Sequence, residues 1–386
     1  MLTTGINFIN FKKTINKKLN LQIISFLKKE KNQVIKSLSK NYKNNFNKKF
    51  IKKFYAFKNF RLIGMGGSIL GSQTIYDFLK SKKKKNFYFI DNLSSKIKEE
   101  KKTITNLIIS KSGNTIETIV NCNVLLKSKD QNIFITENKK NYLHHLAKKL
   151  KAEIVHHNNF IGGRYSVLSE VGMLPAELMG LQSKNFRQYN SLIKNKKFVN
   201  ELVNNVSSTL YFIKKKKFNS IIINYDPQSD SLFKWYQQLI AESLGKKNKG
   251  LLPIVSSMPK DNHSVMQLYL DGFKNNFYTF FYTHEKKTNK INNNKILNPL
   301  KILKNKNLSE IIYAQKKATE NVFKRKKIPF RSFEIKKRDE KTLGELFCFF
   351  ILETILLGKC LKLNPYDQPA VELIKKETKK QLITIR

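Results

Sequence analysis

Cysteine is scarce in this sequence, and long apolar runs are missing from it. The three cysteines, Cys122, Cys348 and Cys360, form no CxxC pair, which argues against a disulfide framework and a zinc site. Unpaired cysteines are typical of a reducing compartment, so we expect a cytoplasmic protein. The most apolar segment, residues 346–357, is interrupted by Glu353 and is shorter than the ~18 residues of a membrane span. The N-terminus lacks the apolar core of a secretory leader, so no membrane partner is expected.

Acidic residues and arginine are also few. Lys and Arg total 74 against 28 Asp and Glu, which gives a formal net charge of +46, and seven of the basic residues are Arg. One interpretation is a polyanion-binding protein. The interpretation that we favour is a solvated, Lys-rich surface, because lysine is spread along the whole chain. Proteins that read nucleic-acid bases use Arg for bidentate contacts, so no specific nucleic-acid partner is expected.

Short apolar segments alternate with amphipathic ones from residue 59 onward. At ~150 residues per domain, 386 residues predict two or three domains. The alternation predicts α/β domains with mainly parallel, doubly wound sheets, flanked by helical N- and C-terminal segments. We expect a helical extension over 1–50, a first domain over 51–185, a second over 186–335, and C-terminal helices over 336–386. The expected strands are 60–63, 87–90, 107–109, 133–136 and 153–155, then 220–224, 251–255, 277–282 and 329–335.

Two segments rich in glycine and serine follow expected strands of the first domain. Residues 64–71 read GMGGSILG, which is neither a dinucleotide fingerprint, because Ile69 replaces its third glycine, nor a P-loop. Residues 110–115 read SKSGNT and are also followed by an expected helix. Backbone N–H groups and hydroxyls at a helix start suit a phosphate. The plain alternative is a tight turn with a helix cap, including a capping box between Asn114 and Glu117.

Four further segments carry groups suited to acid–base chemistry. Arg164 follows two glycines, and its guanidinium can stabilise an oxyanion. Glu242 lies in the last turn of an expected helix, where the negative pole of the helix dipole suits it to accept a proton. His263 is expected in the first turn of a helix, where the positive pole favours neutral imidazole. Gln368 and Lys375 lie in a turn and the helix after it. For each residue the plain alternative is an ordinary surface or capping role.

In this order the segments resemble the glucose-6-phosphate isomerase (phosphoglucose isomerase) family. The resemblance spans about residues 60 to 375, and its most specific parts are the arginine segment and the C-terminal one. The matching runs are GMGGSILG from Gly64, SKSGNTIET from Ser110, GGRYSVLSEVG from Gly162, AESLGK from Ala241, DNHSVMQLYLDG from Asp261 and NPYDQPAVELIK from Asn364.

This resemblance implies two sugar-isomerase (SIS) domains, a homodimer, and no metal or cofactor. The implied activity is the reversible isomerisation of glucose-6-phosphate and fructose-6-phosphate in glycolysis and gluconeogenesis, through ring opening and a cis-enediolate. Glu242 would be the base, Arg164 would stabilise the enediolate, Lys375 would assist at the ring oxygen, and His263 would assist ring opening from the neighbouring subunit. The implied substrate-binding residues are Gly67, Ser68, Ser110, Lys111, Ser112, Thr115 and Gln368.

The sequence departs from the family pattern at two positions, and other functions stay open. Ala370 replaces a usual glycine and Glu170 a usual small residue, which bears on loop geometry. One alternative is an isomerase that also accepts mannose-6-phosphate. A second is a non-catalytic SIS sensor, which would lack the set of Glu242, His263 and Lys375. A third is the polyanion-binding protein, which predicts salt-dependent binding of nucleic acid.

Overall fold

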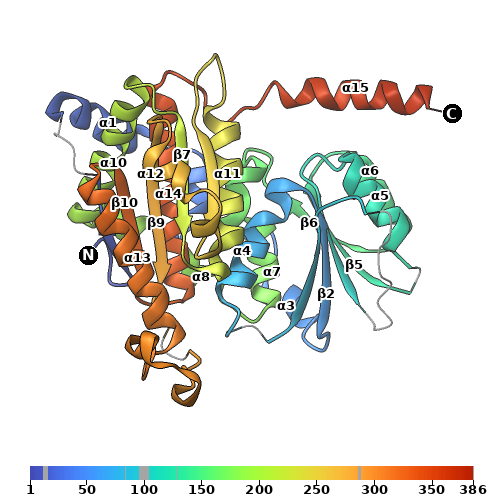
Figure 1. The fold of residues 1–386 in the computed structure, drawn as a ribbon. Helices are drawn as coiled ribbons and strands as arrows, with labels where there is room; N and C mark the ends of the chain where they lie inside the picture. The colour runs from blue at the N-terminus through green and yellow to red at the C-terminus, as the bar shows by residue number, and fades with distance from the viewer. Residues whose placement is uncertain (12–15, 83, 95–103, 128, 286–287, 386) are drawn as a thin grey trace.

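Two five-stranded sheets organise the chain in the computed structural model, which describes residues 1–11, 16–82, 84–94, 104–127, 129–285 and 288–385 (Figure 1). The first sheet is parallel throughout, in the order β3-β2-β4-β5-β6. Its central strands are apolar on both faces, as in β4, where all five residues are buried. The strands are β2 (Asn59–Gly64), β3 (Asn86–Ile90), β4 (Thr105–Ile109), β5 (Gln131–Glu137) and β6 (Glu153–His157).

Helices cover both faces of the first sheet. The helices α5 (Ile116–Leu125) and α6 (Tyr142–Lys149) lie on the side away from the second sheet (Figure 1). On the other side, α4 (Leu70–Phe78) packs against α7 (Glu170–Leu178) and against a helix of the second unit, α11 (Asp230–Leu244). Three shorter elements complete this unit: α3 (Lys48–Lys52) and the 3₁₀ turns η1 (Gly66–Ser68) and η2 (Gly163–Leu168).

The second sheet has the order β1-β10-β9-β7-β8 and is parallel except for β1. The strands are β1 (Ile6–Ile9), β7 (Asn219–Asn224), β8 (Leu252–Ser257), β9 (Asn276–Thr283) and β10 (Phe330–Ile335). Residues 1–50 were expected to be helical, and β1 corrects this for their first part. Ile6 pairs with Ile335, and the alternate residues Ile6 and Phe8 are buried, as in an edge strand with one face on the core.

Asparagine begins many of the helices, which gives this residue a structural use beyond solubility. The Asn307 side chain accepts a hydrogen bond from Glu310 N. The Glu310 carboxylate in turn accepts one from Asn307 N, which completes a capping box. Asn16, Asn32, Asn47, Asn141 and Asn195 also cap helices through their side chains.

The remaining helices are α1 (Lys17–Lys29), α2 (Gln33–Ser37), α8 (Ser183–Phe186), α9 (Tyr189–Lys194), α10 (Lys196–Lys214), α12 (Met266–Asp271) and α13 (Leu308–Arg325), with η3 (Pro227–Ser229), η4 (Lys260–His263), η5 (Asn293–Lys295) and η6 (Asn298–Leu303).

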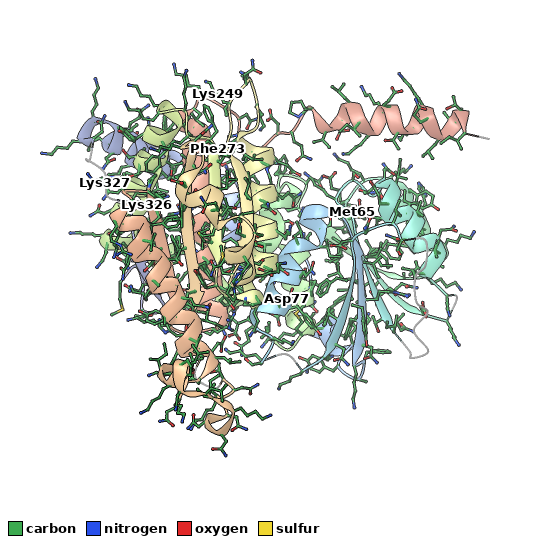
Figure 2. All side chains as sticks on the ribbon, in the orientation of Figure 1. Met65, Asp77, Lys249, Phe273, Lys326 and Lys327 are labelled. Carbon is green, nitrogen blue, oxygen red and sulfur yellow. The ribbon has the colours of Figure 1, made fainter. Side chains whose placement is uncertain are left out.

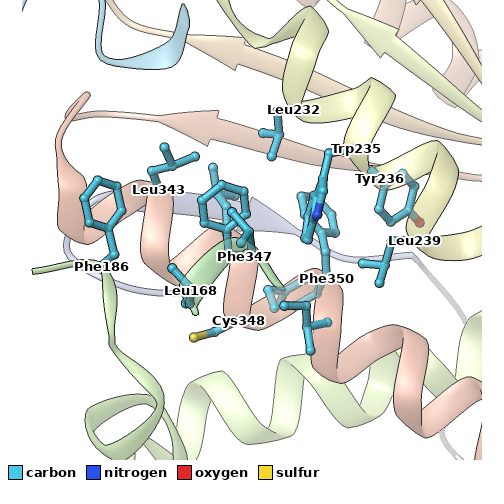
Figure 3. Close-up of a cluster of buried hydrophobic side chains, with 14 of the residues drawn as sticks. Leu168, Phe186, Leu232, Trp235, Tyr236, Leu239, Leu343, Phe347, Cys348 and Phe350 are labelled. Carbon is cyan, nitrogen blue, oxygen red and sulfur yellow. The ribbon is translucent and has the colours of Figure 1, made fainter. Parts of the chain in front are cut away.

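The helix α14 (Glu340–Cys360) forms the centre of the core. It is apolar on all sides, which is typical of a buried helix, and it packs against α8, α10 and α11. Figure 3 shows the contact between α11 and α14, where the Trp235 and Phe347 rings lie 4.9 Å apart. Aromatic side chains of this size contribute most to the stability of such a core. Within the described residues, no helix has the length and apolar character needed to cross a membrane.

The last helix, α15 (Val371–Thr384), extends away from the body (Figure 1). All its residues are exposed, including Leu373 and Ile374 at 69% each. The C-terminal segment 336–386 therefore divides into a helix at the centre of the core and a helix outside it.

Candidate active site

The candidate site lies where the first sheet meets the C-terminal end of α11. The loops that follow β2 and β4 leave the same edge of the first sheet, because Gly64 pairs with Ile109. Ligands of parallel sheets bind beyond this edge. A cavity of about 760 Å³ lies at the C-terminal end of α11, lined by Ala241 and Glu242, by residues 245–249, by Leu363 and Asn364, and by residues 367–371.

The loop after β2 packs backbone to backbone against the loop that carries Arg164. Gly66 has a φ of +52°, which favours glycine. A Cβ atom on Gly67 would lie 2.2 Å from the carbonyl carbon of Gly163, so that position has no room for a side chain. Ser68 stands beside Gly64, with its Cβ 3.2 Å from where a Cβ of Gly64 would be. The glycines therefore allow the two loops to approach closely.

The loop after β4 presents hydroxyls at the start of α5. The Ser110 and Thr115 hydroxyl oxygens lie 2.9 Å apart, and Gly113 has a φ of +64°. Thr115 is the N-cap of α5, but its side chain accepts no hydrogen bond from the described backbone N–H groups of that helix. The expected capping box is wrong, because Asn114 accepts from Tyr142 N instead, at 3.0 Å. This arrangement of hydroxyls at a helix N-terminus suits an anion.

Lys111 supplies a cation at the same loop. Its Nζ atom lies 3.3 Å from Glu137 Oε1, at the end of the neighbouring strand β5. The Lys111 side chain is one-third exposed, and Ser112 beside it is exposed. A surface pair of this kind stabilises little, so an anionic ligand can replace the carboxylate at small cost.

Arg164 is the most constrained side chain of the site. It is 2% exposed, and its guanidinium donates to five oxygens from two parts of the chain, the end of α11 and the turn before α15. This network fixes the guanidinium beside the cavity, where a planar cation can stabilise negative charge. The five acceptors are Ser243 Oγ at 2.7 Å, Glu242 Oε2 at 3.2 Å, Gln368 Oε1 at 2.7 Å, Pro365 O at 2.7 Å and Asp367 O at 2.9 Å.

Glu242 occupies the last turn of α11, as expected. Its Oε2 atom contacts Arg164, and its Oε1 atom accepts from Gln238 Nε2 at 2.9 Å. The side chain is 25% exposed and lines the cavity. A carboxylate held at both oxygens and open to a cavity can act as a positioned base. Sequence reasoning missed Gln238, although its spacing of four residues from Glu242 places both on one helix face.

Two buried aromatic side chains bond to Arg164 and to its hydrogen-bond acceptors. The Trp235 indole N–H donates to the Arg164 carbonyl at 3.1 Å. The Tyr165 hydroxyl lies 2.9 Å from Ser243 Oγ and donates to Pro365 O at 3.0 Å. Burial raises the pKa of Tyr165, so the hydroxyl keeps its proton and remains a donor. Sequence reasoning missed these residues, because supporting contacts carry no local motif.

Salt bridges and hydrogen bonds fix the turn that carries Gln368. Lys246 Nζ lies 2.6 Å from Asp367 Oδ1, and the Tyr366 hydroxyl donates to Glu30 at 2.7 Å. Ala370, which departs from the family pattern, has φ and ψ of −64° and −32°. That conformation is open to any L-residue, so this position does not need glycine.

Glu170, the second departure, is a structural residue. Its carboxylate is buried and accepts from the Tyr42 hydroxyl at 2.9 Å and from Asn45 N at 3.2 Å. His157 Nδ1 lies 3.7 Å away. These contacts join the N-terminal segment to the first unit, and their partners are Tyr42, Asn45 and His157, not the proposed catalytic groups.

The structure brings Arg164, Glu242 and Gln368 together. His263 and Lys375 lie on other parts of the chain. His263 is exposed and ends the turn η4, after β8. The expectation of His263 in the first turn of a helix is wrong, because α12 begins at Met266. Lys375 is exposed on α15 and pairs with Glu372 at 2.6 Å. Among the described residues, no group of three or more His, Cys, Asp or Glu side chains is placed to hold a metal ion.

The corresponding edge of the second sheet is closed by ion pairs. Arg338 Nη2 lies 2.9 Å from Asp226 Oδ1 and 2.6 Å from Glu285 Oε1. The same guanidinium donates to the Phe78 carbonyl of α4 at 3.3 Å. Side chains therefore occupy the crevice in which such a sheet would bind a ligand.

Known proteins resemble this chain over most of its length. The family model described as phosphoglucose isomerase matches residues 27–384. The chain is 33% identical over 349 residues to a glucose-6-phosphate isomerase of Methanocaldococcus jannaschii, covering 84% of each chain. It is 32% identical over 340 residues to a glucose-6-phosphate isomerase of Campylobacter jejuni, covering 82% of this chain and 83% of that one.

Solved structures share the fold at lower identity. A hypothetical protein from Thermus thermophilus superposes with a TM-score of 0.81 at 20% identity, covering 95% of this chain and 94% of that one. A glucose-6-phosphate isomerase from Chlamydia trachomatis superposes with a TM-score of 0.75 at 16% identity, covering 99% and 89%. These likenesses confirm the expected α/β fold with two mainly parallel sheets.

Proposed function

Because this chain belongs to the phosphoglucose isomerase family, its activity is the isomerisation of glucose-6-phosphate to fructose-6-phosphate, and we propose which residues carry out each step. The contact of Arg164 with Glu242 beside the cavity is the observation that carries the assignment. An aldose–ketose isomerisation moves a proton between C2 and C1 of the open sugar. That transfer needs a base at the carbon and a cation at the oxygen that becomes negative.

Glu242 is the base of the proposed reaction. Its carboxylate takes the proton from C2 of the open aldose, which gives a cis-enediolate, and returns it to C1. Because C1 and C2 are adjacent, one carboxylate on one face of the sugar can serve both carbons. The partly exposed position of Glu242 on the cavity wall supports this role.

Arg164 stabilises the enediolate oxygens in this proposal. Its buried guanidinium is held by four oxygens besides Glu242, so little reorganisation accompanies the chemical step. Gln368 bonds to Arg164 and lines the same cavity, which supports its role in holding the sugar.

The two loops of the first sheet bind the phosphate group. Their hydroxyls, their backbone N–H groups and one lysine suit a phosphomonoester, and both loops end at the same sheet edge. The proposed phosphate-binding residues are Gly67, Ser68, Ser110, Lys111, Ser112 and Thr115.

Ring opening requires an acid and a base that the Arg164 cluster does not supply. We assign this step to His263 and Lys375, and we infer that His263 comes from a second copy of the chain in a homodimer. The position of His263 in an exposed turn, after the carboxyl end of β8, supports this inference. A cytoplasmic location also remains our proposal, supported by the unpaired thiols of Cys122, Cys348 and Cys360.

The base assignment is tested by running the reaction in heavy water. We expect the wild-type protein to convert fructose-6-phosphate and to place deuterium at C2 of the product, because Glu242 exchanges its proton with solvent. Glu242→Gln should bind the sugar phosphate without turnover or exchange. Turnover without any deuterium incorporation would contradict proton transfer by a carboxylate.

The shared site is tested by mixing two inactive variants. Glu242→Gln and His263→Gln proteins, unfolded and refolded together, should regain roughly a quarter of the wild-type activity, because half the dimers are mixed and each mixed dimer holds one intact site. Activity that stays at the level of the separate variants would place His263 in its own chain's site.

A further inference from the structure

A second cavity, of about 350 Å³, lies at the start of three parallel strands of the second sheet. Its walls carry Lys217 just before β7, Lys274 just before β9, and Lys326 and Lys327 just before β10. The strands bring these residues to one edge, since Asn219 pairs with Asn276 and Phe330 with Tyr278. None of its lining residues lines the cavity beside Glu242.

The charge of this cavity is strongly one-sided. Four lysines line it, and Asp271 is the one acidic residue of its wall in the described part of the chain. The Asp271 carboxylate is 70% exposed and lies 3.8 Å from Lys326 Nζ, a surface pair that offsets little of the positive charge. The Lys217 Nζ atom donates to the Lys274 carbonyl, so Lys274, Lys326 and Lys327 are the cations that an occupant with two or more negative charges would compensate.

The other walls are apolar or already hydrogen-bonded. Asn276 donates to the Tyr278 hydroxyl at 3.0 Å, and that hydroxyl donates to the Tyr269 carbonyl at 3.2 Å. Burial raises the pKa of Tyr278 to about 12, so this phenol adds no negative charge at neutral pH. The Phe273 ring is 54% exposed and lines this cavity together with Lys326 and Lys327, which Figure 2 labels.

We propose that this cavity binds a nucleoside di- or triphosphate, with the phosphates on the lysines and the base against Phe273. The size of the cavity is at the small end of ligand sites and fits a small molecule, not a nucleic-acid duplex. The lysines account for the polyphosphate, and an exposed aromatic ring beside cations accounts for a planar base. This site is separate from the isomerase site and does not depend on the roles assigned there.

The experiment is calorimetric titration of the full-length protein with ADP and with pyrophosphate, at about 0.15 M salt. Saturating fructose-6-phosphate is present, so that the phosphate loops of the first sheet are occupied. We expect one ADP per chain, bound more tightly than pyrophosphate. More than one ADP per chain, or no ADP binding under these conditions, would overturn the proposal.

Two double variants that remove the same charge locate the site. Lys274→Gln/Lys327→Gln should weaken ADP binding about tenfold or more, because each lysine would bond to an ionised phosphate. Lys148→Gln/Lys149→Gln, on the exposed side of α6, should change it less than about twofold. Equal losses in both variants would mean that the positive surface as a whole binds the anion, and would refute a built site.

Phe273→Ala separates a nucleotide from a simple polyphosphate. We expect this variant to lose affinity for ADP and to keep its affinity for pyrophosphate, because only the base contacts the ring. If both ligands bind unchanged, the assignment of a base to Phe273 is wrong. Unchanged isomerase activity in all these variants serves as the check that they are folded.

Discussion

The Nη1 atom of Arg164 lies 3.2 Å from Oε2 of Glu242, so the proposed base and the proposed oxyanion partner are in direct contact. In the proposed reaction Glu242 becomes neutral when it takes the proton, and the enediolate oxygen becomes negative in the same step. The guanidinium of Arg164 can then stabilise the enediolate oxygen in place of the Glu242 carboxylate, and it does not need to move. Its four other acceptors hold the guanidinium in place while this happens.

Glu242→Gln should lower kcat by about 10²–10⁴-fold, because the amide cannot accept the proton. The affinity for fructose-6-phosphate should stay within a few-fold, since the phosphate loops are unchanged. A coupled assay for glucose-6-phosphate and calorimetry measure the two quantities. Glu153→Gln, an exposed glutamate of β6, is the control and should behave as wild type. Near-normal turnover of Glu242→Gln would remove this residue from the role of base.

Arg164→Lys should lower kcat by about 10²–10³-fold although the charge is kept. A lysine has one nitrogen and cannot reach the five oxygens that the guanidinium bonds, so the cation is no longer fixed beside the cavity. Steady-state kinetics of Arg164→Lys and of Arg325→Lys, an exposed arginine of α13, give the comparison. Equal activity of the two variants would show that charge alone suffices at residue 164.

Gly67→Ala should destabilise the protein by about 1–3 kcal/mol, because the added methyl group overlaps the backbone of Gly163. Gly163→Ala is the matched control. A Cβ on Gly163 would have its nearest neighbour at 3.7 Å, which is ordinary contact. Urea denaturation of both variants measures the difference. An equal loss of stability in the two would argue against the close packing of these loops.

Lys375→Gln should lower kcat, and Lys376→Gln should not. Both lysines are exposed neighbours on α15, and each variant removes one charge. Lys375 also pairs with Glu372, but such a pair stabilises a helix by only about 0.2–0.5 kcal/mol. A large loss of kcat in Lys375→Gln alone therefore indicates a role of residue 375 at the sugar. Steady-state kinetics with fructose-6-phosphate give the comparison, and activity of Lys375→Gln equal to that of Lys376→Gln would contradict the assignment.

Glu170 should make the stability of the protein sensitive to acid. Burial raises the pKa of this carboxyl, but contact with His157 and with Tyr42 lowers it by more, so the pKa lies below its ordinary value of 4.5. A group whose pKa is lowered by folding contributes stability above its unfolded pKa and loses it as the pH falls through the folded value. The contribution of Glu170 is therefore complete above about pH 5 and lost on acidification.

Glu170→Gln should be less stable than wild type at pH 7, by about 1–3 kcal/mol, and should lose less stability below pH 5. Urea denaturation at a series of pH values measures both effects. Glu153→Gln, on the surface, should follow the wild-type curve. If Glu170→Gln lost as much stability below pH 5 as the wild type, the buried carboxylate of Glu170 would not be the cause of the acid sensitivity.

The parallel strands and most long helices were predictable from the sequence because buried strands are continuous apolar runs. The expected strand 60–63 is β2 within a few residues, and the helix expected to hold Glu242 in its last turn is α11. The strand β1 was not predictable. It has four residues and pairs with a strand more than 300 positions away, and no local pattern encodes such a contact.

Arg164 and Glu242 could be chosen from the sequence as candidates, but the contacts that hold them could not. Arg164 and Glu242 could be singled out because a rare residue follows two glycines and a carboxylate ends an apolar helix. Two acceptors of Arg164, at Pro365 and Asp367, are backbone carbonyls, which every residue has and which therefore leave no sequence signal. The closed edge of the second sheet was missed for a similar reason, since Arg338 and Asp226 are far apart in sequence.

The pairing of β1 with β10 also sets an order of events during synthesis. β1 leaves the ribosome more than 300 residues before its partner β10. The helix α14, at the centre of the core, comes after β10 and is made later still. The first unit can fold during synthesis. The apolar side chains of Ile6 and Phe8 stay exposed to solvent until β10 has been made. Contacts this distant in sequence close slowly, and an uncovered strand is a site for aggregation.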